Sequence, residues 1–156
     1  MNVENILLLM KNKIALFEIF KNTTNEMLSC DSDVLPSLIK KRQELIEKID
    51  VIQDEIKYIC DGTANGIKIK EAMDNTCDFA DVENDLLPVF TAGQDLFAVI
   101  NTTKRLDEQL HFRLSQEIDT LDKKIREINT GNSAKASMYF ENMGIKTESH
   151  TQLGNA

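Results

Sequence analysis

The sequence predicts an all-α protein: an elongated antiparallel bundle or coiled coil of three main helices, with a short helix near the C-terminus. Apolar residues recur every seven positions between Asp33 and Ile59, and stripes with helical spacing precede and follow this run. A hydrophobic fraction of 42% with 28% charged residues is typical of chains that fold. We expect a helical bundle over residues 1–130, and a short helix with a flexible tail over 131–156.

The first main helix is predicted over about residues 2–29, where the apolar residues form one wide stripe. Asp31, Ser32 and Asp33 then offer side chains that cap a helix, and Pro36 falls in a first turn, where its missing N–H costs no helical bond. The second helix is therefore expected over about 32–60. The stripe of the first helix consists of Val3, Ile6, Leu7, Met10, Ile14, Phe17, Phe20, Met27 and Leu28.

The second helix carries the heptad pattern, which we call the α-hairpin seam. One heptad position holds Leu35, Arg42, Ile49 and Ile56, and the other holds Leu38, Leu45, Ile52 and Ile59. Such a seam predicts a partner helix of comparable length. We expect that partner to be the protein's own long C-terminal helix.

The segment from Gly62 to Asp78 mixes glycine and asparagine with short apolar alternation, and it is expected to be an irregular connector. The longest helix is predicted over about 80–130, where the apolar stripe changes phase in steps of four between Leu106 and Leu114. The residues from Asn129 to Asn132 favour the end of this long helix, and Gly144 favours the end of a further short helix.

The net charge of −8 argues against nucleic-acid binding, because phosphate contacts need clustered Lys and Arg. The three cysteines form no Cys-x-x-Cys pair, which favours reduced thiols in a cytoplasmic protein. The N-terminal apolar run is too short for a membrane span and has no basic region before it, so neither membrane insertion nor a signal peptide is expected.

The spacing of Glu108 and His111 is the Glu-x-x-His spacing that supplies ligands in di-iron helical bundles. Such a site needs a second Glu-x-x-His, and the only other histidine, His150, lies in the polar tail. No glycine-rich phosphate loop or nucleophile motif is present either. The sequence therefore predicts no catalytic residues, no metal site, no cofactor and no enzymatic activity.

Two segments carry a resemblance to a known family. The second helix contains a basic residue followed by Gln, Glu, Leu-Ile and Ile-Asp, and the C-terminal region contains a Gly-x-x-Ala-x-x-x-Tyr-like ending. With the apolar first helix and the long later helix, this order resembles flagellar type III export chaperones of the FlgN/FliT class. The matching residues are Arg42, Gln43, Glu44, Leu45, Ile46, Ile49 and Asp50, then Gly131, Ala134 or Ala136, and Tyr139.

The resemblance implies a cytoplasmic chaperone that binds a late export substrate, typically a hook-associated or filament-cap protein. It would prevent premature self-association of that substrate and deliver it to the export gate, and Tyr139 is the residue that could dock on a gate component. The alternatives are a generic coiled-coil adaptor or secretion-related structural protein and, more remotely, a metal-dependent helical enzyme. The sequence leaves open which substrate is bound and whether the free protein is a homodimer.

Apolar and aromatic residues that follow Gly131 are the candidate partner-binding residues. They lie outside the main stripe, in a segment with few charges, and form either a docked final helix or an exposed binding element. These residues are Met138, Tyr139, Phe140, Met143 and Ile145.

Overall fold

The computed structural model describes residues 2–142, which are helical apart from turns and short connections. The main helices are α1 (Asn2–Met27), α2 (Leu35–Asp61), α3 (Gly66–Met73) and α4 (Leu87–Asn142). Two single turns of 3-10 helix, Phe79–Asp81 and Asn84–Leu86, precede α4. No strand occurs in the described range, so the prediction of an all-α protein is confirmed.

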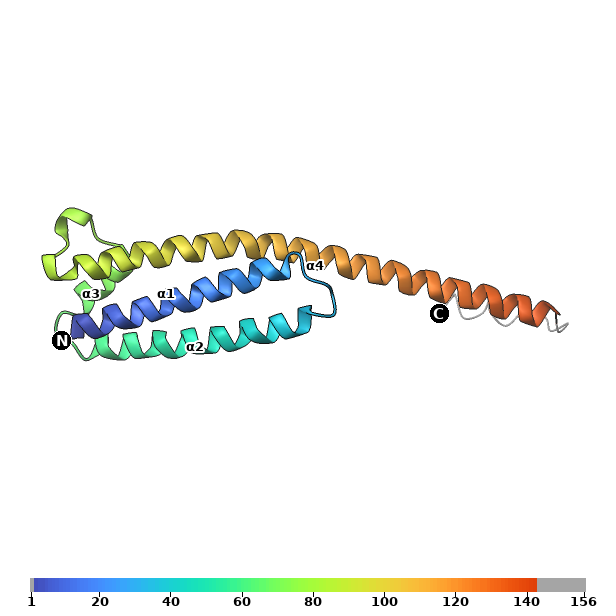
Figure 1. The fold of residues 1–156 in the computed structure, drawn as a ribbon, viewed down its shortest axis with the longest axis horizontal. Coiled ribbons are helices and arrows are strands. Elements are labelled where there is room, and N and C mark those ends of the chain that lie inside the picture. The colour runs from blue at the N-terminus through green and yellow to red at the C-terminus, as the bar shows by residue number, and fades with distance from the viewer. Residues whose placement is uncertain (1, 143–156) are drawn as a thin grey trace, which may run out of the picture. The chain divides into compact units, whose positions relative to one another are not determined.

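Helices α1 and α2 run antiparallel and side by side, joined by the turn at residues 28–34 (Figure 1). The buried face of α1 includes Ile6, Met10, Phe20 and Met27, as its apolar stripe predicts. Thr23 and Thr24 are also buried, and their hydroxyls donate to the carbonyl oxygens of residues 19 and 20 at 2.8 and 2.9 Å. These bonds satisfy polar groups that would otherwise be buried without a partner.

The start of α2 differs from the expected capping. The N-cap residue is Val34, and no side chain caps the helix, although Asp31, Ser32 and Asp33 precede it. A capping side chain accepts a bond from the second or third helical N–H, and Pro36 at the second position has none. Ser37 instead turns back, and its hydroxyl donates to the Val34 carbonyl at 2.8 Å.

The α-hairpin seam is the buried face of α2. None of its side chains is exposed: some are fully buried and the rest are half-buried. The sequence pattern therefore identified which side of this helix faces the interior. The buried members are Leu35, Leu38, Leu45, Ile49 and Ile56, and the half-buried ones are Arg42, Ile52 and Ile59.

Helix α3 lies in the segment that was expected to be irregular, and two glycines allow it to pack closely. A Cβ on Gly66 would lie 1.9 Å from the carbonyl oxygen of Cys60, and one on Gly93 would lie 2.2 Å from that of Met73. Real side chains cannot approach backbone so closely, so α3 fits between the end of α2 and the start of α4 only because glycine occupies both positions.

Asn75 closes this connection. Its backbone is left-handed, with φ of 52°, a conformation that asparagine tolerates better than most residues. Its side-chain amide donates to the carbonyl oxygens of Ala72 and Phe90 at 2.8 and 3.0 Å, which ties the end of α3 to α4.

One hydrophobic core joins the four helices around α3. Side chains from α1, α2, α3, the 3-10 turn Asn84–Leu86 and the first turns of α4 contact one another there, and all are at most 6% exposed. The core consists of Ile6, Met10, Ile56, Cys60, Ile69, Ala72, Leu86, Val89, Phe90 and Ala92.

The chain divides into two units, Met1–His111 and Phe112–Ala156, and the division falls within α4. The sequence signals instead suggested a division after residue 130. Helix α4 does not stop there but continues through Gly131, where an added Cβ would meet nothing within 4 Å. A lone glycine costs a helix only about 1 kcal/mol relative to alanine, and no proline follows it to break the helix.

Candidate partner-binding surface

The predicted partner-binding residues fall at the C-terminal end of α4. Met138 and Tyr139 are 63% and 61% exposed, while Phe140 is half-buried. The rings of Tyr139 and Phe140 pack edge to face, with centroids 6.0 Å apart. Met143 and Ile145 lie outside the described residues. The structure therefore places Met138, Tyr139 and Phe140 on one helical turn, where they offer apolar and aromatic surface to solvent.

A second apolar feature lies on the same helix, and we call it the α4 seam. Its members recur at intervals of four and three residues, and most are more than half exposed. The sequence pattern identified the apolar stripe of the long helix but did not predict that its C-terminal part is exposed. The α4 seam consists of Leu114, which is half-buried, and Ile118, Leu121, Ile125 and Ile128, which are exposed by 59%, 56%, 55% and 60%.

Charged residues flank the α4 seam and keep its helix polar on the other sides. Arg113 and Glu117 form an ion pair at 3.0 Å one helical turn apart. Asp122 and Lys124 lie beside the seam and are exposed. This combination of an apolar stripe with charged flanks is typical of a helix that pairs with another helix.

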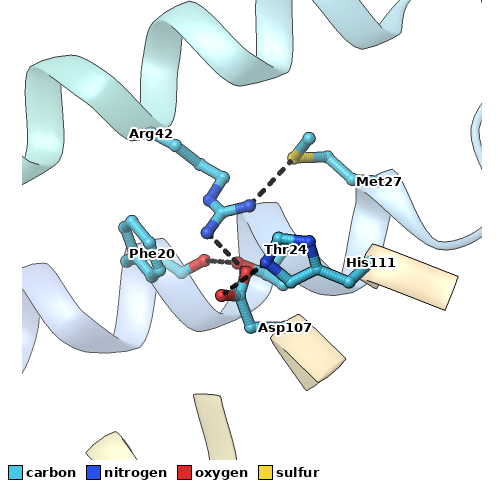
Figure 2. Close-up of polar contacts among 6 residues, drawn as sticks. All are labelled: Phe20, Thr24, Met27, Arg42, Asp107 and His111. Atoms are coloured by element: carbon cyan, nitrogen blue, oxygen red, sulfur yellow. Dashed lines mark hydrogen bonds and ion pairs between the residues drawn. The ribbon is translucent and has the colours of Figure 1, made fainter. Parts of the chain in front are cut away.

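A polar cluster on the other unit surrounds Arg42 (Figure 2). Arg42 Nη2 donates to Asp107 Oδ1 at 2.7 Å, Nη1 lies 3.9 Å from the sulfur of Met27, and the guanidinium stacks 4.5 Å above the ring of Phe20. These contacts connect α1, α2 and α4. Arg42 Nε is buried and has no hydrogen-bond partner among the residues that the structure describes.

The Glu108 and His111 pair does not form a ligand site. Both side chains are exposed, and His111 Nε2 lies 3.8 Å from Asp107 Oδ2, the carboxylate that Arg42 binds. Within residues 2–142, no group of three or more His, Cys, Asp or Glu side chains could hold a metal ion. In the same range, no helix has the length and apolar content needed to cross a membrane.

Comparison with known families, curated proteins and solved structures found no match to this chain. Its possible roles therefore depend on the exposed apolar residues of α4 and on the sequence resemblance.

Proposed function

We propose that this protein is a cytoplasmic export chaperone of the FlgN/FliT class. It would bind a late flagellar export substrate, a hook-associated or filament-cap protein, prevent its premature self-association and deliver it to the export gate. The observation that carries the proposal is the exposure of Met138 and Tyr139 at the end of a long helix. Exposed apolar side chains on a polar helix are typical of surfaces that bind an amphipathic partner.

The proposed architecture is an elongated antiparallel bundle of three main helices, with α3 as a short addition. Contacts between α1 and α2, and the Arg42 to Asp107 ion pair between α2 and α4, support this arrangement. In the proposed role this bundle is a scaffold, and α4 presents the binding residues. The client would be an amphipathic helix that aggregates when it is left unbound.

The proposed client-binding residues are Met138, Tyr139 and Phe140, together with Met143 and Ile145. Burial of a large apolar side chain contributes about 1.5–3 kcal/mol, so this short cluster would give moderate and reversible affinity. Tyr139 would also contact a component of the export gate through its ring and hydroxyl. No cofactor and no catalytic step are part of the proposal.

Removal of residues 131–156 tests the chaperone proposal. The truncated protein should lose binding to purified hook-associated and filament-cap proteins in titration calorimetry, while residues 2–111 keep their helical structure. The matched control is Gly131→Ala in the full chain, which keeps every binding residue. Binding that survives the truncation with unchanged affinity would contradict the proposal.

A coiled-coil adaptor is the second candidate, and the α4 seam favours it. An adaptor would hold one partner permanently, whereas a chaperone releases its client during export. Tyr139→Ala separates the two, because in a chaperone this change should impair export in a motility assay more than it weakens substrate binding; an equal loss of both would mean that Tyr139 only contributes to the client-binding surface. Normal export with the variant would favour the adaptor.

A further inference from the structure

The α4 seam has the regular spacing of a two-stranded coiled coil. From Leu114 to Asn132, the intervals are four, three, four, three and four residues, so these positions line one side of the helix. This side is largely exposed, since four consecutive members are between 55% and 60% accessible. The helix thus presents a nearly complete coiled-coil stripe to solvent.

The residue types at the two heptad positions favour a parallel pair of helices. The a positions hold Ile118, Ile125 and Asn132. The d positions hold Leu114, Leu121 and Ile128, so two of the three are leucine. In parallel dimers, β-branched residues at a and leucine at d favour two strands. A single asparagine at an a position sets the register and limits the assembly to a dimer.

We propose that a second copy of this chain pairs with residues 114–132 in parallel and in register. In this pairing, each apolar residue of the seam meets the same residue of the second copy. Asn132 meets Asn132 of the second copy, and the two amides can bond to each other. A second copy in register always places an asparagine opposite Asn132, whereas an unrelated helix does so only by chance.

The chain's own tail is a poor occupant of this surface. Residues 143–156 contain few large apolar side chains, namely Met143, Ile145 and Leu153, and their spacing is not that of a heptad. Two copies, in contrast, would bury five regularly spaced apolar residues from each helix. This pairing would bury a surface area on the order of 600–1,000 Å², which is at the lower end of the range for specific interfaces. We therefore expect a reversible dimer.

Flanking charges distinguish the two possible orientations. In a parallel pair, Glu117 lies opposite Asp122 of the second copy, and these like charges repel weakly because both are near the surface. In an antiparallel pair over the same residues, Asn132 would face Leu114 and lose its polar partner. Glu117 would then lie opposite Gly131, and Lys124 opposite Lys124 of the second copy. The apolar and amide layers favour the parallel pair, and the charges oppose it only slightly.

Sedimentation equilibrium of the full chain, over protein concentrations from low to high micromolar, tests this inference without any client protein. The wild type should form dimers with a Kd on the order of 10 µM. Ile125→Asp should make the protein monomeric, and Ile125→Ala, which retains helix propensity, should weaken the dimer at least about ten-fold. The control is Val51→Asp, which adds the same charge to α2 at a site that is 65% exposed.

Glu117→Lys tests the orientation. In the parallel dimer this change replaces a repulsive contact with an attractive one, so the dimer should tighten. In an antiparallel dimer residue 117 would face the uncharged Gly131, so the affinity should not rise, and that result would overturn the parallel pairing. A wild type that stays monomeric at every concentration would overturn the inference. So would a dimer that Ile125→Asp leaves intact. A monomer whose Ile125→Asp variant stops binding a hook-associated protein would show that a client helix occupies the seam.

Discussion

Arg42 Nη2 lies 2.7 Å from Asp107 Oδ1, and this ion pair joins α2 to α4. Arg42 occupies a heptad position where the neighbouring turns place leucine or isoleucine. Its side chain is only 18% exposed, so its charge depends on the carboxylate for compensation. Stacking on Phe20 adds α1 to the same contact, and one side chain thereby connects three helices.

Asp107→Ala should lower the free energy of unfolding by about 1–3 kcal/mol, because it leaves the half-buried guanidinium without its charged partner. Arg42→Leu should cost less, since leucine restores an apolar residue to the α-hairpin seam. Urea unfolding followed by circular dichroism measures both changes. Glu108→Ala, at an exposed neighbouring site, is the control and should have little effect; a larger loss for Arg42→Leu than for Asp107→Ala would contradict this account.

Gly66→Ala and Gly93→Ala should each lower the free energy of unfolding by about 2 kcal/mol or more. The added Cβ would clash with a backbone carbonyl oxygen in both cases, and backbone cannot move aside cheaply. Thermal unfolding monitors the loss. Gly131→Ala is the matched control, because its Cβ meets open space and should stabilise α4 by about 0.5–1 kcal/mol. Equal effects at all three glycines would show that helix propensity, not close packing, governs these sites.

Ile56→Ala should lower the free energy of unfolding by about 2–5 kcal/mol, because Ile56 is 1% exposed and contacts the core that joins the helices. Val51→Ala on the exposed side of the same helix should change it by less than about 0.5 kcal/mol. Urea titration of the two variants compares the two sides of α2. A similar loss from both would mean that the α-hairpin seam does not define the interior.

Cys60 should react most slowly of the three cysteines with a thiol reagent in the folded protein. Burial in the core raises the pKa of the Cys60 thiol above its usual value, whereas Cys30 and Cys77 are half-buried. Mass spectrometry after timed alkylation measures the three rates. In urea the three rates should become similar, and rapid modification of Cys60 in the folded protein would contradict its placement in the core.

The same raised pKa predicts a loss of stability at alkaline pH. The folded protein favours the neutral Cys60 thiol, while the unfolded chain ionises with a pKa near 9.0. The contribution of the Cys60 thiol to the free energy of unfolding is therefore complete below that pH, and it is lost as pH rises through the folded-state pKa. Urea titrations measure the free energy of unfolding of the wild type and of Cys60→Ala at neutral and alkaline pH. The difference between the two proteins in this free energy should shrink as pH rises.

The sequence was informative wherever a local repeat governs the structure. The α-hairpin seam identified the buried face of α2, and Arg42 was correctly placed among its residues, because heptad spacing alone determines which side chains share a face. The start of α2 was less predictable. Capping by Asp31, Ser32 or Asp33 depends on a free N–H in the first turn, and Pro36 removes one.

Features that depend on distant parts of the chain could not be predicted. Helix α3 packs closely against α2 and α4 because Gly66 and Gly93 carry no Cβ, and these close contacts depend on where the other helices lie. The exposure of the α4 seam also depends on how many helices are available to cover it. Of the candidate site, Met138 and Tyr139 are exposed on α4, and their role in binding stays a prediction.

The two close-packed glycines also limit how this sequence can vary over evolutionary time. Every missense change at a glycine codon adds at least one carbon atom, so Gly66 and Gly93 have no conservative substitute. A related chain that lacks one of them should also lack α3 or carry a longer connector. The pair, separated by the left-handed Asn75, would thus serve as a fingerprint for recognising distant relatives whose helical segments have diverged beyond detection.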